Sequence, residues 1–261
     1  MRAKYLGLDL PSPIIVSSSP YTSNVKSVEQ CAASGAGAVV LKSIFEEQIL
    51  HHAAALDAVS DSAYGDAEVY LQRYLGEDYK AGFLRLVQEA RSKTDLPVIA
   101  SINCVADKGD WIEYATAMAD AGASALELNI FIQPTDIHAQ ARELELNYAE
   151  IVGRVAGAVK IPVSVKLPMR LTNVFALSSA LLGYGARGVV FFNRFFEPDV
   201  DVERMTFVES SPYSEPTELR NVLRMVAICS ARLRSKRFCA EPRQCRSARR
   251  STRRDSKSLP K

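Results

Sequence analysis

Short apolar runs recur along the chain and begin in two alternating ways. Three runs begin at a proline, three begin at a Gly-Ala pair, and the two kinds alternate strictly. Each run is rich in apolar and branched residues, which predicts strands buried on both faces, as in a parallel sheet. The runs that begin at a proline are Pro13–Ser18, Pro97–Asn103 and Pro162–Lys166, and those that begin at Gly-Ala are Gly35–Lys42, Gly122–Asn129 and Gly185–Asn193.

Segments of helical periodicity separate these runs. Asn24 or Ser23 is placed to cap a helix that stops at Gly35, and a helix that starts at Asp110 stops at Gly122. The Gly-Ala pairs are therefore expected to end helices and lead into strands. Further helices are expected over residues 79–92, 136–156, 174–182 and 215–231.

Six consecutive βα units fit either a closed barrel or a doubly wound sheet. The strict repetition, without a G-x-G-x-x-G turn, favours the barrel, and the length of 261 residues is close to the ~250 typical of that fold. The predicted fold class is α/β, a (β/α)8 TIM-type barrel. Its strands 7 and 8 are missing or replaced, because no apolar run of strand length follows Cys229.

The distribution of charge separates the end of the chain from the rest. The whole chain has a net charge of +2, but residues 232–261 hold 12 basic and 2 acidic residues. We predict an incomplete barrel over residues 1–231 and a basic, disordered tail over residues 232–261. The tail could serve anionic partners, be a disordered appendage, or be an out-of-frame translation, which we favour because it begins where a seventh strand is due.

Cysteine usage and the apolar stretches bear on the cellular location. The five cysteines contain no CxxC pair, which argues against a disulfide framework and against a zinc site. The N-terminus has no apolar run of signal-peptide length, and the longest apolar stretch is interrupted by Gly183, Gly185 and Arg187. We expect a cytoplasmic protein without a membrane anchor.

Polar residues end every one of the six runs. In β/α barrels the active site lies at the C-terminal ends of the strands. The set contains two lysines, three amides and several hydroxyls but no carboxylate, so it predicts an anionic or electron-rich ligand. These residues are Ser17, Ser18, Lys42, Ser43, Asn103, Asn129, Lys166 and Asn193.

Taken in chain order, the residues at the strand ends resemble those of the dihydroorotate dehydrogenases. These are FMN-dependent barrels that oxidise dihydroorotate to orotate in pyrimidine biosynthesis. The resemblance covers residues 5–231, beginning with an N-terminal hairpin over residues 5–14. Its most specific matches are Lys42-Ser43, Leu128-Asn129, Val165-Lys166 and Asn193.

The resemblance implies an FMN-binding barrel and a role for each strand end. Lys166 would stabilise negative charge that develops at the pyrimidine edge of the flavin. Lys42 and Asn129 would be catalytic, and Lys42, Asn129 and Asn193 would bind a small planar anionic substrate. The residues implied in FMN binding are Ser18, Lys42, Ser43, Asn103, Asn129 and Lys166.

One departure from the family concerns the general base. In the family, the Leu-Asn pair is followed by a Ser or Cys that removes a substrate proton. In this chain, residues 129–134 are Asn-Ile-Phe-Ile-Gln-Pro. Tyr21, His51, His52 and Cys104 are weak substitutes. We therefore expect a divergent oxidoreductase acting on CH-CH groups, with an altered substrate or lost activity.

Other functions and partners remain open from the sequence alone. A lysine-dependent barrel aldolase could use Lys166 or Lys42, and a non-catalytic protein could bind anions through the tail. Nucleic acid is disfavoured, because Phe238 is the one aromatic residue of the tail. The electron acceptor is not assigned.

Without two strands the sheet would expose edges at Pro13–Ser18 and Gly188–Asn193, so we expect an unstable or flavin-free product unless it forms a homo-oligomer.

The frame-shift hypothesis makes a prediction about the gene. Beyond codon 231, one of the two alternative reading frames should encode an apolar run that begins at a proline and then one that begins at Gly-Ala. Sequencing the genomic locus tests this, and two alternative frames without such runs would disprove the hypothesis.

Overall fold

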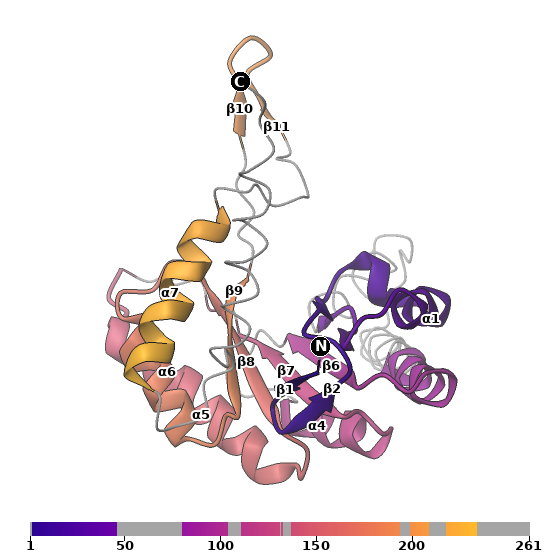
Figure 1. Ribbon diagram of the computed structural model, residues 1–261. Helices are drawn as coiled ribbons and strands as arrows, with labels where there is room; N and C mark the ends of the chain where they lie inside the picture. The colour runs from indigo at the N-terminus through magenta and orange to yellow at the C-terminus, as the bar shows by residue number, and fades with distance from the viewer. Residues whose placement is uncertain are drawn as a thin grey trace, which may run out of the picture.

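The computed structural model describes residues 2–45, 80–103, 111–130, 132, 137–193, 199–208 and 218–233. Within them, six parallel strands form one curved sheet in which each strand neighbours the next along the chain (Figure 1). A further short strand, β5 (Ile44–Phe45), pairs with the third of the six. The six are β3 (Ile15–Val16), β4 (Ala38–Val40), β6 (Val98–Asn103), β7 (Ala125–Asn129), β8 (Val163–Pro168) and β9 (Gly188–Asn193).

Helices connect these strands and cover the outer, convex side of the sheet (Figure 1). This confirms the six βα units and the α/β class. After the short 3-10 turn η1 (Pro20–Ser23), the helices are α1 (Val25–Ala33), a helix over residues 80–93, α4 (Trp111–Asp120), α5 (Ala141–Ala158), α6 (Val174–Gly183) and α7 (Glu218–Arg232).

One helix starts later than its sequence pattern predicts. The helix expected over residues 136–156 is α5, which begins at Ala141. Residues 137–138 form a turn, and Gln140 at the helix N-cap has extended backbone angles of φ −86° and ψ 130°. The apolar periodicity thus extends into the preceding loop, where it does not specify a helix.

The predicted helix boundaries at Asn24 and the glycines are confirmed. The Asn24 side chain accepts a hydrogen bond from the Ser27 amide at 3.0 Å, which satisfies a free N–H of the first turn of α1. Gly35, Gly122 and Gly185 each have a positive φ, between 81° and 114°. Glycine adopts this left-handed conformation without steric cost, so each of the three ends its helix and turns the chain into the next strand.

The N-terminal hairpin closes one end of the concave side. Strands β1 (Ala3–Tyr5) and β2 (Leu8–Leu10) pair in antiparallel fashion, which confirms the expected hairpin. Their buried side chains form an apolar cluster with side chains of β4, β6 and β7. The cluster consists of Tyr5, Leu10, Ala38, Val40, Ile99 and Ala125.

The sheet is open in the part of the chain that is described. Strands β3 and β9 form its two ends and are not paired with each other, so the described residues form a curled half-barrel. They contain no seventh or eighth parallel strand, and the closed (β/α)8 barrel is not confirmed. The predicted basic tail lies outside the described residues from residue 234 onwards.

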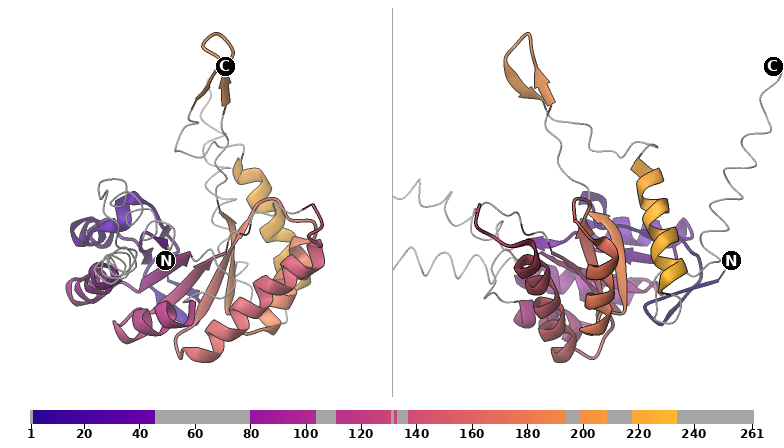
Figure 2. Two further views of the ribbon diagram at one scale, coloured as in Figure 1. Left: turned by 180° about the vertical axis from the view of Figure 1, so that it is seen from behind. Right: turned by 90° about the vertical axis from the view of Figure 1, so that its left-hand side faces the viewer.

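A second hairpin follows β9 and was not expected from the sequence. Strands β10 (Asp199–Asp201) and β11 (Thr206–Val208) pair in antiparallel fashion, and this hairpin projects away from the half-barrel (Figure 2). Its turn is held by Asp201, whose Oδ1 accepts hydrogen bonds from the amides of Glu203 and Arg204 at 3.0 Å. Among the described residues, no helix has the length and apolar character needed to cross a membrane.

Gly37 permits a close approach between the chain entering β4 and the chain entering β3. Its amide donates a hydrogen bond to the Ile14 carbonyl oxygen at 2.6 Å, and an added Cβ would lie 1.9 Å from the Ser12 carbonyl oxygen. We expect Gly37→Ala to destabilise the protein by about 1–3 kcal/mol, as overpacking does in protein interiors. Urea denaturation followed by circular dichroism measures this change.

Gly157 provides the matched control. It lies in α5, and an added Cβ there would have no neighbour within 4 Å. Gly157→Ala should leave stability unchanged or raise it by up to about 1 kcal/mol, because alanine is the better helix former. Equal denaturation midpoints for the two variants would contradict the proposed contact.

Candidate active site

Alternation along the strands decides which side chains reach the concave side. In β7, Leu126 and Leu128 pack into the main core between the sheet and the helices. Successive side chains of a strand point to opposite faces, so Ala125, Glu127 and Asn129 point into the half-barrel. From the N-terminal hairpin outwards, the concave side of this strand therefore presents the apolar Ala125, then the acidic Glu127, then the amide of Asn129.

The register across neighbouring strands places Asn129 beside Lys166. These two residues are paired between β7 and β8. Asn129 is buried, and its Oδ1 atom has no hydrogen-bond partner within the described part of the chain, whereas Lys166 is half-buried. A buried carbonyl oxygen without a partner costs free energy, so this atom is available to a donor on a ligand.

Three serines form a hydrogen-bonded chain at the same end of the sheet. The Ser18 Oγ atom accepts a hydrogen bond from the Ser43 amide at 3.0 Å and lies 3.2 Å from the Ser43 Oγ atom. The Ser43 Oγ atom in turn lies 2.7 Å from the Ser101 Oγ atom on β6. This chain fixes the loops after β3 and β4 to each other and to the centre of the sheet.

The remaining predicted residues also lie at the ends of strands. Lys42 follows β4, and its amide donates a hydrogen bond to the Thr22 carbonyl oxygen at 3.3 Å. Asn103 is the last residue of β6, and Asn193 is the last of β9, where it pairs with Pro168 after a register shift. All three residues are half-buried. Because the strands are parallel, these residues lie at the same edge of the sheet as Ser18, Ser43, Asn129 and Lys166.

The sequence analysis missed Glu127, which lies on the concave side one pair of residues below Asn129. It is 4% exposed and pairs with Ser101 on β6 and with Ser164 on β8. Burial raises the pKa of its carboxyl group, and the positive charge of Lys166 opposes this effect. The signal in the sequence is a charged residue inside an apolar strand rather than at its end.

The structure describes part of the segment that lacks the usual base. Ile130 is fully buried in the main core, and the Ile132 amide donates a hydrogen bond to the Tyr148 hydroxyl oxygen at 3.1 Å. Burial raises the pKa of Tyr148, which disfavours its phenolate form. Tyr21, one weak substitute, donates its hydroxyl hydrogen to Gln30 Oε1 at 2.7 Å. The other three, His51, His52 and Cys104, lie outside the described residues.

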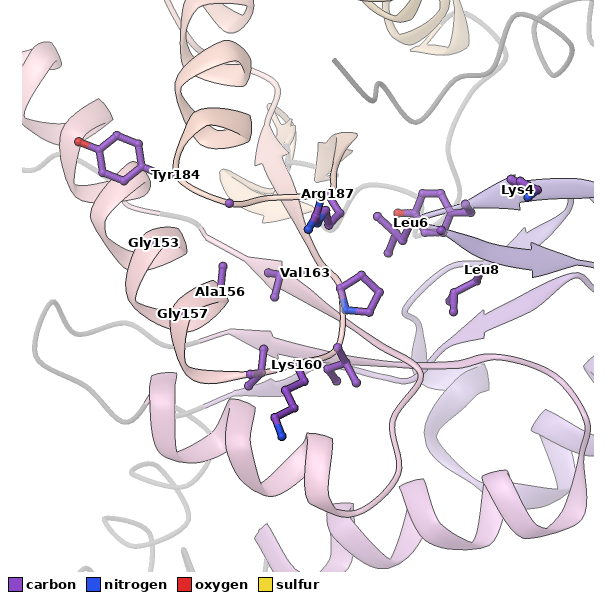
Figure 3. A pocket seen from close by; sticks show the side chains of 16 residues that line it. Lys4, Leu6, Leu8, Gly153, Ala156, Gly157, Lys160, Val163, Tyr184 and Arg187 are labelled. Atoms are coloured by element: carbon purple, nitrogen blue, oxygen red, sulfur yellow. The ribbon is translucent and has the colours of Figure 1, made fainter. Parts of the chain in front are cut away.

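A cavity of about 950 Å³ lies at the opposite end of the strands (Figure 3). It is bordered by the hairpin residues Lys4 and Leu8 and by Lys160, Val163 and Arg187 near the starts of β8 and β9. None of the predicted site residues lines it. Because parallel strands carry their functional groups at their C-terminal ends, this cavity is not the predicted flavin site.

Comparison with known proteins finds proteins named as dihydroorotate dehydrogenases. Over 123 residues, 45% of this chain, it is 35% identical to an Aeropyrum pernix protein named "Putative dihydroorotate dehydrogenase A (fumarate)", of which 38% is covered. Over 204 residues, 75% of the chain, it is 29% identical to the catalytic subunit of dihydroorotate dehydrogenase B (NAD(+)) of Methanocella arvoryzae. Over 195 residues it is 25% identical to the subunit of the same name in Fusobacterium nucleatum, covering 74% of the chain.

The extent of these matches limits what they show. The chain spans 38% of the length of the first relative and 62% of each of the other two. No protein-family model matches the chain. The matches to several relatives nevertheless confirm the resemblance expected from the strand ends: this is a divergent chain similar to dihydroorotate dehydrogenases.

Proposed function

We propose that this chain is a divergent FMN-dependent oxidoreductase of the dihydroorotate dehydrogenase type, built on part of a (β/α)8 barrel. The observation that carries the proposal is the pair Asn129 and Lys166. A buried amide oxygen without a partner lies in register with a lysine, at the edge of the sheet where barrel enzymes bind their ligands. The similarity to named dihydroorotate dehydrogenases supports the same assignment.

The residues at the strand ends fit a flavin ring chemically. An isoalloxazine ring presents an N–H donor and carbonyl acceptors along its pyrimidine edge. The Asn129 Oδ1 atom could accept from that donor, and the ammonium groups of Lys42 and Lys166 could donate to the acceptors. When bound, FMN would supply the hydride-accepting chemistry that amino-acid side chains lack. Ser18, Ser43 and Asn103 would complete the set that holds the ring.

The same edge would orient the substrate. In the proposal Lys42, Asn129 and Asn193 bind a small planar anion of the dihydroorotate type, and Lys42 and Asn129 contact the reacting part. A lysine neutralises the carboxylate, while the amides fix the ring by directional hydrogen bonds. The proposed reaction is oxidation of a CH-CH bond in the cytoplasm, as a step of pyrimidine biosynthesis. Its electron acceptor is left open.

The proton that leaves with such a hydride needs an acceptor. Ile130 and Ile132 carry no group that takes a proton, and the Tyr21 hydroxyl already donates to Gln30. The proposal therefore includes a changed substrate, whose proton leaves to water or to another side chain, or loss of turnover with retention of flavin binding.

The open sheet supports a proposal about assembly. Strands β3 and β9 end the sheet in the described residues, and an unpaired strand edge favours pairing with another chain. The loops after the last two strands of a barrel commonly bind phosphate, and no such loops belong to the described residues. We propose that stable flavin binding requires a homo-oligomer that supplies these contacts.

The visible absorption spectrum of the purified full chain tests the flavin proposal, and the released cofactor is identified after denaturation. We expect bound FMN, in an oligomer by light scattering. Lys166→Met should weaken FMN binding by about 10- to 100-fold, since it removes a hydrogen bond from a charged group worth about 1.5–3 kcal/mol. Asn129→Ala should weaken it by about 3- to 10-fold, since its hydrogen bond joins neutral groups and is worth about 0.5–1.5 kcal/mol. Fluorescence quenching measures the dissociation constants.

Lys160→Met is the matched control for the loss of a lysine. Lys160 is exposed and borders the cavity at the other end of the strands, so its removal should leave FMN affinity unchanged. A folded, colourless wild-type protein that does not bind added FMN would refute the proposed function. Full flavin occupancy in a monomer that unfolds cooperatively would refute the proposed assembly.

A further inference from the structure

Glu127 is an acid in a place where an acid is costly. Its side chain points into the half-barrel from the middle of β7, with the fully buried Ser101 on one side and Ser164 on the other. The Ser164 hydroxyl group donates its hydrogen to the Leu126 carbonyl oxygen at 3.0 Å, so that hydrogen is not available to Glu127. A buried carboxyl group without compensation lowers stability, which calls for an explanation of its presence.

The charged group that acts on Glu127 is Lys166. Glu127 pairs with Ser164, and Asn129 pairs with Lys166, so Glu127 and Lys166 are diagonal neighbours on adjacent strands. Both side chains lie on the concave face, where their charges interact, although no ion pair within 4.0 Å joins them among the described residues. Among the described residues, Lys42, after β4, is the other lysine at this edge, and the sequences of β3, β6 and β9 contain no titratable residue. Tyr5 of the N-terminal hairpin is buried in the apolar cluster that includes Ala125 of β7. The lysine charge favours the ionised form of the Glu127 carboxyl group, against the effect of burial.

We propose that Glu127 is a positioning residue for Lys166: its carboxyl group, one pair of residues below, orients the lysine's ammonium group toward the edge where ligands bind. A lysine side chain is a flexible four-carbon chain with a point charge, so it gains precision from a fixed counter-charge. The inference rests on the proposed function for its purpose, but the coupling of the two residues is independent of any flavin.

The coupling is tested first in flavin-free full-length protein. The carboxyl carbon of Glu127 is followed by NMR as a function of pH, and Glu127→Gln assigns the resonance. Lys166→Met should move the titration of Glu127 to higher pH, because burial alone then sets its pKa. Lys160→Met, which removes an exposed lysine, should not move it. An unchanged titration in Lys166→Met would overturn the proposal.

The second test separates a positioning role from a structural one. The folded-state pKa of Glu127 is raised, so between the ordinary Glu pKa of about 4.3 and the folded value the folded protein holds a proton that the unfolded chain has released. Stability therefore falls as pH rises through that window. Glu127→Gln removes this loss and should raise the melting temperature at neutral pH relative to wild type.

The same variant should bind FMN about tenfold more weakly, although it is more stable. Glu127→Asp, which keeps the charge, should recover part of the affinity. Glu143→Gln removes an exposed carboxylate at the start of α5 and should change neither property. Equal FMN affinity in Glu127→Gln and wild type would overturn the positioning role. If no variant and no wild-type protein binds FMN, the proposed function fails, and the NMR titration still decides the coupling.

Discussion

Every strand of a parallel sheet has to bury two faces, and in this chain the two faces are buried by different means. On the convex side, helices cover the alternate apolar residues of β6 to β9 in one continuous core. On the concave side, the N-terminal hairpin packs on Ala38, Val40, Ile99 and Ala125. Above this apolar cluster the concave faces of β6, β7 and β8 are polar, and hydrogen bonds or ligands have to satisfy them.

The polar part of the concave side has two levels with different properties. The lower level contains Ser101, Glu127 and Ser164, which are buried and matched in register. The upper level contains Asn129 and Lys166, and the buried Asn129 oxygen has no hydrogen-bond partner among the described residues. The lower level thus supplies a carboxyl group and hydroxyl groups beneath an edge that is incomplete without a donor. This difference links the stability of the sheet to the binding proposed at its edge.

Local signals in the sequence were sufficient for the frame of this fold. Proline and Gly-Ala entries predicted six strands, and the Asn24 cap and the positive φ of Gly35, Gly122 and Gly185 follow from local backbone chemistry. The predicted site residues are brought to one edge because parallel strands end on the same side. The β10–β11 hairpin was missed because its strands have three residues each, too short for a period to show.

Glu127 was missed for a different reason. Its importance depends on which residues lie beside it on β6 and β8. The sequence of one strand does not show its register with strands that are distant in sequence. The sequence of β7 alone shows that Glu127 alternates with leucines, but not that it lies diagonal to a lysine of the neighbouring strand. The electrostatic interaction between Glu127 and Lys166 is therefore visible only in the structure.

The departure at the usual base position affects only one side of the proposed site. Ile130 continues the alternation of Leu126 and Leu128 toward the helices and is buried among them, and Tyr148 of α5 holds the Ile132 amide. Ile130 and Ile132 are thus held by apolar packing and by a hydrogen bond from a backbone amide to the Tyr148 hydroxyl oxygen. In the proposed site, the groups that would hold a flavin lie at the strand ends, whereas the proton acceptor of the family would lie in the loop after β7. In this proposal, divergence replaces the proton acceptor in the loop and retains the residues at the strand ends.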